Sequence, residues 1–193
     1  MLLLGVVVVM VLAIQMDLDA AQKQRLIGGL LWVAIFFSGT LAIDRSFGQE
    51  REEGCLDGLM LYPVSPAVVY LAKFAVNVLA LASVECVLIP LFVVLTNTPL
   101  LVHPWAMLLL TMLGNLGISA VGTLLGAVTS GIHRRGNLLA LLVLPLVLPV
   151  VLGAAEATRL MLVGNFGSEW CRWVQLLIAF AVIFITAGLV LFE

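Results

Sequence analysis

Long apolar runs separated by short polar segments make up most of this chain. Within a run nearly every position is apolar, which is typical of helices surrounded by lipid rather than of helices with one buried face. The runs predict six transmembrane helices, at residues 1–14, 26–43, 67–95, 105–128, 138–155 and 173–192. We therefore expect an all-α, polytopic membrane protein, with residues 1–193 forming a single transmembrane domain.

The first apolar run, residues 1–14, is shorter than the others. At 1.5 Å per residue, fourteen residues cover about 21 Å of a hydrocarbon core about 30 Å thick. The run also lacks the basic n-region and the small-residue cleavage site of a signal peptide. We expect a first transmembrane helix cut short by the start methionine, followed by an aqueous connection over residues 15–25.

Residues 44–58 form a polar island between the second and third runs. The island holds seven of the twenty Asp, Glu, Lys and Arg residues of the chain. Charged side chains are costly in hydrocarbon, so this segment is expected to lie in water, as a coupling loop to which a separate motor protein binds. A solvated loop without a partner is the alternative. Beyond it, Pro63 and Pro66 predict a hinge, because each removes a backbone donor and restricts the preceding residue.

Composition narrows the possible functions. Hydrophobic residues make up 63% of the chain and charged residues 10%, and the net charge is −2, so a soluble fold or a nucleic-acid-binding surface is not expected. The three cysteines are far apart and show no metal-ligand spacing. No nucleotide-binding P-loop, metalloprotease motif or nucleophile elbow occurs, so energy for any work is expected to come from another chain.

Several polar residues interrupt the apolar runs. Lys73 is expected to snorkel to water, whereas Glu85, about 18 Å further along the helix, falls at hydrocarbon depth. We expect Glu85 either to be protonated and hydrogen-bonded to a neighbour such as Asn115 or to serve transport. Polar residues recur every four positions in the fourth run, and this stripe needs a protein or water-lined neighbour. The stripe consists of Thr111, Asn115, Ser119 and Thr123.

Small residues and prolines indicate how the later helices pack. Gly122 and Gly126 form a GxxxG pair, which predicts a central position for the fourth helix. Pro145 and Pro149 each remove a helical hydrogen bond, so the fifth helix is expected to kink. Residues 156–172 read as the longest remaining connection, with an apolar stretch that could form a short interfacial helix.

The two ends of the predicted bundle differ in charge and in aromatic content. Six spans place both termini, the polar island and residues 130–137 on one side. The tryptophans of the later connections, Trp105, Trp170 and Trp173, then fall at the opposite interface, as in an aromatic belt. A small excess of Lys and Arg favours a cytoplasmic position for the island.

The island and a second segment carry a family resemblance. The first block comprises Asp44, Arg45, Phe47, Glu50, Gly54, Leu56, Leu59, Leu61, Pro63, Leu71, Ala72 and Lys73, and resembles the coupling segment of type-2 ABC exporter permeases. The second comprises Arg134, Arg135, Gly136 and the leucine-rich run to Pro149, and is most similar to the haem exporter protein B (CcmB) family of bacterial cytochrome c maturation. The chain departs from the family in lacking an interfacial N-terminal helix and in having Cys55.

The resemblance implies a permease subunit of a haem exporter in the bacterial inner membrane. The implied partners are a cytoplasmic ATPase (CcmA), a haem-handling membrane subunit (CcmC), a small single-span protein (CcmD) and membrane lipid. Haem is a possible handled ligand, but no cofactor bound by this chain and no catalytic residue is implied. The coupling segment, about residues 44–66, would contact the ATPase through Asp44, Arg45, Phe47, Glu50, Arg51, Glu53, Gly54, Leu56, Leu59, Pro63 and Lys73.

Two other functions fit the same resemblance. The chain could be a scaffold that anchors the ATPase beside the haem-handling subunit and conducts nothing, or an exporter of another substrate. A conducting subunit is expected to have a cleft bounded by the polar stripe, whereas a scaffold should be packed shut. His103 is expected to be an interfacial residue rather than a haem ligand, and the methionines are expected to serve packing.

Overall fold

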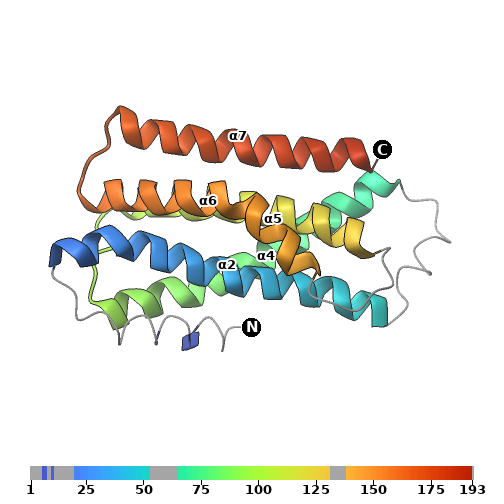
Figure 1. Ribbon diagram of the computed structural model, residues 1–193, viewed down its shortest axis with the longest axis horizontal. Helices are drawn as coiled ribbons and strands as arrows, with labels where there is room; N and C mark the ends of the chain where they lie inside the picture. The colour runs from blue at the N-terminus through green and yellow to red at the C-terminus, as the bar shows by residue number, and fades with distance from the viewer. Residues whose placement is uncertain (1–5, 8–9, 11–19, 53–64, 131–137, 193) are drawn as a thin grey trace.

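The described residues of the computed structural model form a bundle of long helices (Figure 1). These residues are 6–7, 10, 20–52, 65–130 and 138–192. The helices are α2 (Ala20–Glu52), α4 (Pro66–Thr96), α5 (Pro104–Ser130), α6 (Leu138–Leu162) and α7 (Ser168–Leu191). All five are long and apolar enough to cross a membrane. The all-α, multi-pass class is therefore confirmed, with five such helices found where six were expected; the remaining predicted span, residues 1–14, lies almost entirely outside the described part.

Successive helices run in opposite directions, and α5 lies at the centre of the bundle. It contacts α2, α4, α6 and α7, which confirms the central position that the small residues of the fourth run predict. The ends of α2 and α7 and the starts of α4 and α6 gather at one end of the molecule (Figure 1). The connection 97–103 and the starts of α5 and α7 lie at the other end, where Trp105, Trp170 and Trp173 are found as predicted.

Large side chains of α2 pack directly on glycines of α5. A Cβ atom at Gly114 would overlap the Trp32 ring, one at Gly122 would overlap Ile43, and one at Gly126 would overlap Phe47. Because glycine has no side chain, the two backbones approach closely along the whole contact. The GxxxG pair thus serves packing against α2.

The expected start and end of α2 are wrong. Residues 20–25 were expected in a connection, and residues 44–52 in an aqueous loop, yet α2 runs without interruption from Ala20 to Glu52. The buried face of the helix continues from Ile43, the last residue of the apolar run, to Phe47 beyond it. Glu, Gln and Arg are good helix formers, so the polar sequence gives no reason for the helix to stop.

The expected connection at residues 156–172 is also much shorter. Helix α6 continues to Leu162, and α7 begins at Ser168, so only residues 163–167 lie between them. Ala157, Thr158 and Met161 extend the buried face of α6, and the bidentate ion pair between Glu156 and Arg159 compensates both charges within the helix. The expected interfacial helix is therefore absent, and Gly164, with φ +73°, ends the last turn of α6.

Prolines occupy two kinds of position. Pro66 lies in the first turn of α4, where its missing N–H leaves no intrahelical bond unmade, while Pro63 lies outside the described residues. Pro145 and Pro149 lie inside α6, and Pro90 lies inside α4. Figure 1 draws α6 with a bend in its N-terminal half.

Candidate functional site

The last two turns of α2, together with Ser65 and Pro66, form the described part of the coupling segment. Asp44 and Arg45 are exposed at the end of the bundle, where a partner could reach them. Helix α2 includes Glu50 and Arg51, although their side chains lie outside the described part. The remaining predicted contacts are outside the described residues altogether: Glu53, Gly54, Leu56, Leu59 and Pro63. The segment therefore begins as a rigid extension of a transmembrane helix.

Phe47 lies inside the bundle instead of on the surface of the coupling segment. Its side chain is only 8% exposed and packs on the backbone of α5 at Gly126. The Nζ atom of Lys73 lies 5.0 Å from the centre of the Phe47 ring and is buried. The expectation that Lys73 snorkels to water is therefore wrong, because its ammonium group is drawn over the aromatic face. Phe47 links the ends of α2, α4 and α5.

A ladder of polar side chains joins the middle of α4 to the middle of α5. The Asn115 amide nitrogen donates to Glu85 Oε2 at 3.2 Å and to the Val78 carbonyl oxygen at 3.1 Å. The Ser119 hydroxyl donates to Asn115 Oδ1 at 3.1 Å. The expected hydrogen bond between Glu85 and Asn115 is thus present, and it is protein rather than lipid that satisfies these buried groups.

The ladder continues toward the coupling segment through a residue that the sequence did not single out. The Asn77 amide donates to Thr123 Oγ1 at 2.9 Å, and Thr123 donates to the Ser119 carbonyl oxygen. Asn77 is one polar residue in a run of apolar ones, eight positions before Glu85 and so on the same face of α4. That spacing is the signal that could have found it.

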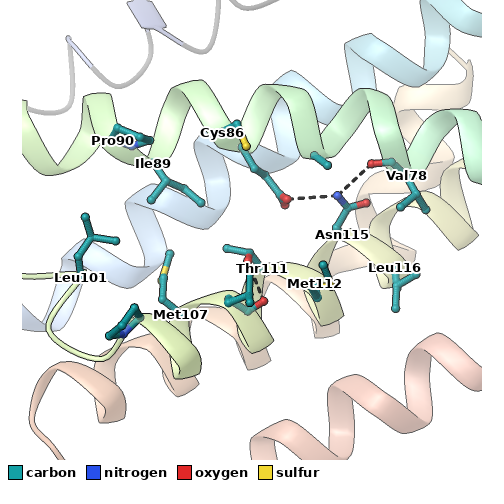
Figure 2. A pocket seen from close by; sticks show the side chains of 14 residues that line it. Val78, Cys86, Ile89, Pro90, Leu101, Met107, Thr111, Met112, Asn115 and Leu116 are labelled. Atoms are coloured by element: carbon teal, nitrogen blue, oxygen red, sulfur yellow. Dashed lines mark hydrogen bonds between the residues drawn. The ribbon is translucent and has the colours of Figure 1, made fainter.

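A groove of about 430 Å³ lies between α4 and α5, beside Glu85 and Asn115 of the ladder. Figure 2 shows its lining and the two hydrogen bonds of Asn115. Glu85, Thr111 and Asn115 are its polar residues, and the rest of the lining is apolar or carries sulfur: Val78, Ala82, Cys86, Ile89, Pro90, Leu101, Pro104, Met107, Leu108, Met112 and Leu116. Its volume lies within the range of about 300–1,000 Å³ common for small-molecule sites.

The groove does not extend along the whole polar stripe. Thr111 and Asn115 line it, whereas Ser119 and Thr123 are completely buried between helices. The described part of the bundle therefore has a cleft in the half that lies away from the coupling segment, and close packing in the other half. His103 lies outside this cleft and packs edge-on against Phe166, with 4.9 Å between ring centres. Among the described residues, no cluster of His, Cys, Asp and Glu could hold a metal ion.

Two other buried contacts were not expected from the sequence. The Trp32 indole nitrogen donates to Thr158 Oγ1 at 2.9 Å, which joins α2 to α6. Tyr70, near the start of α4, is 2% exposed and packs on the α7 backbone at Gly188. Thr158 lies in a stretch expected to be a connection, so its partner could not be inferred.

Comparison with known proteins gives a consistent result. The family model described as CcmB protein matches residues 1–192. Proteins named heme exporter protein B are similar: that of Paracoccus denitrificans is 37% identical over 145 residues, 73% of this chain and 64% of the relative. That of Pseudomonas aeruginosa is 33% identical, covering 82% of this chain and 70% of the relative. The chain thus spans about two thirds of these relatives. No solved structure matches it significantly.

Proposed function

This chain belongs to the CcmB family, and from that membership we propose that it is the membrane permease subunit of an ABC-type haem exporter for c-type cytochrome biogenesis. ATP is hydrolysed by a separate cytoplasmic subunit, because the sequence contains no nucleotide-binding P-loop. This CcmA-like subunit binds at the coupling segment, in the cytoplasm beneath the bacterial inner membrane. CcmC-like and CcmD-like membrane proteins complete the assembly.

The observation that carries the proposal is the continuity of α2 from the membrane into the polar segment. A flexible loop would absorb a push from a partner, whereas a continuous helix transmits it along its axis. Phe47 then passes the displacement sideways, because it is wedged against the α5 backbone at Gly126 and lies under Lys73 of α4. The charged residues Asp44 and Arg45 lie just before this wedge, exposed for contact.

The cleft between α4 and α5 favours a subunit that handles a ligand over a pure scaffold. A scaffold was expected to be packed shut, and the half of the bundle near Ser119 and Thr123 is packed in this way. The scaffold is therefore the second candidate, supported by that half. The cleft beside Glu85 supports the first candidate, a subunit that handles a ligand.

The experiment that tests the function is complementation of a bacterium lacking its own CcmB-type protein. The intact chain should restore covalent haem attachment to c-type cytochromes, measured by haem staining of membrane proteins after denaturing electrophoresis. A matched ATPase-null strain should show no restoration. Normal membrane insertion of the chain without any restored c-type cytochrome would contradict the proposal.

A further inference from the structure

The groove between α4 and α5 has one polar atom that the protein leaves unsatisfied. Both donor hydrogens of the Asn115 amide are used, one by Glu85 and one by the Val78 carbonyl, and its oxygen accepts from Ser119. The Thr111 hydroxyl donates to the Leu108 carbonyl of its own helix. Glu85 is 5% exposed, and its Oε1 atom is buried without a hydrogen-bond partner among the described residues.

The hydrogen bonds around Glu85 determine whether its Oε1 atom acts as a donor or an acceptor. Oε2 of Glu85 accepts a hydrogen bond from Asn115, so a proton on the carboxyl group belongs on Oε1. The groove lining contains no Lys, Arg or His, and an ionised carboxylate without a cation is costly in hydrocarbon. Neutral Glu85 therefore presents an O–H donor for which the described residues supply no acceptor.

The groove opens at the outer surface of the described bundle, which would face lipid in a membrane protein. Leu108 and Met112, on its α5 wall, are 49% and 61% exposed, and Cys86 on the α4 wall is also exposed. A ligand dissolved in the bilayer could therefore enter between the helices, bury an apolar body among these side chains and reach Glu85.

We propose that this groove is where the chain holds haem, with one haem carboxyl group, kept neutral by the same lack of a cation as Glu85, accepting a hydrogen bond from Glu85 through its carbonyl oxygen. The proposal rests on the proposed function, which supplies haem as the cargo. A porphyrin is a flat apolar body whose carboxyl groups sit at one edge, which matches an apolar groove with one donor. Asn115 is a positioning residue, since its hydrogen bond to Oε2 directs the free Glu85 oxygen.

The native cysteine of the groove provides the measurement. In the double variant Cys55→Ser, Cys171→Ser, Cys86 is the remaining thiol. The protein is placed in phosphatidylcholine nanodiscs, and the rate at which a membrane-permeant maleimide labels Cys86 is followed with increasing haem. Haem should slow the labelling in a saturable way, whereas iron etioporphyrin, which has the same ring without carboxyl groups, should need about a tenfold higher concentration, corresponding to one lost hydrogen bond.

Three substitutions test the role of Glu85. Glu85→Gln keeps a donor in the groove, because its amide oxygen can accept from Asn115 while its N–H₂ group takes the place of Oε1, so protection by haem should persist. Glu85→Met has a similar shape without a donor and should require about tenfold more haem. Thr186→Val is the control, since that hydroxyl lies on α7 outside the groove and is bonded within its own helix, and it should behave as the parent protein.

The result that overturns the proposal is a labelling rate unaffected by haem, or equal protection by haem and etioporphyrin. Protection that follows the phospholipid content of the disc and not haem would assign the groove to lipid and would also overturn it. If Glu85→Met folds poorly, the comparison of haem with iron etioporphyrin on the parent protein still tests whether the haem carboxyl group is recognised. If the chain restores c-type cytochromes but haem does not protect its Cys86 from labelling, the groove is not the haem site. The proposed function would then still stand.

Discussion

Gly114 shows how a single position determines the closeness of two helices. The Trp32 ring is completely buried and lies where a Gly114 side chain would be. A large aromatic ring enclosed by the core has no free space into which to move, and interiors are close-packed. The distance between α2 and α5 at this level is therefore set by the absence of a Cβ atom.

Gly114→Ala should consequently destabilise the protein by about 1–3 kcal/mol, the usual cost of overpacking a core. The measurement is thermal unfolding of the purified protein in one detergent at fixed concentration. Gly29→Ala is the control, because a Cβ atom at Gly29 would meet nothing within 4 Å and alanine is the better helix former. Equal melting temperatures for the two variants would show that the contact with Trp32 is not tight.

Thr158 makes a second testable contribution at the residue scale. Thr158→Val keeps the shape of the side chain but leaves the buried Trp32 N–H without its acceptor, at a cost of about 1–3 kcal/mol. The control is Thr186→Val, whose hydroxyl is exposed and bonds only within α7. The same unfolding experiment applies, and a loss at Thr186 as large as that at Thr158 would argue against a special role for the bond.

At the scale of elements, the proposed role of α2 is to transmit a displacement from its charged end into the bundle. Phe47 is the side chain that connects that end to α5 and to Lys73 of α4. Removing it should leave the exposed surface proposed for the ATPase unchanged while breaking the contact proposed to carry displacement into the bundle. Binding and coupling are therefore expected to separate at this residue.

Phe47→Ala should retain the co-purifying ATPase but lower cytochrome c maturation by about tenfold. Truncating a buried Phe commonly removes about 3–5 kcal/mol of packing, and a loss of only about 1.4 kcal/mol of that from the coupling contact corresponds to a factor of ten. Co-purification and haem staining are measured on the same membranes. Phe37→Ala, on the same helix but 45% exposed, should affect neither. Loss of ATPase binding in Phe47→Ala at normal protein level would mean that Phe47 acts at the interface.

The elements themselves were largely predictable, because an apolar run of membrane length has few alternatives. The bounds of α4 and α5 lie within two residues of expectation, and the bond between Glu85 and Asn115 follows from matching depth. The ends of α2 and α6 were not predictable, because charged residues end an apolar run without ending a helix. Phe47 was assigned to a surface for the same reason, since a loop was assumed where the helix continues.

At the scale of the whole molecule, the two ends of the bundle have different surfaces. The end with Asp44 and Arg45 offers charged residues on a rigid helix, and the other end offers an aromatic surface around Trp105, which is 81% exposed. The groove opens in the half nearer the aromatic end, and the packed half separates it from the coupling segment. Energy is thus expected to enter at one end and the ligand to be held toward the other.

The most direct test of the account is a crosslink from the charged end of α2 to the ATPase. In a chain whose own cysteines are replaced by serine, Arg45→Cys is compared with Val102→Cys, an exposed position at the opposite end. A short bifunctional maleimide is applied to membranes containing the whole complex. The account predicts an adduct between the ATPase and the Arg45→Cys chain and none with Val102→Cys. An ATPase adduct at position 102 but not at 45 would contradict it.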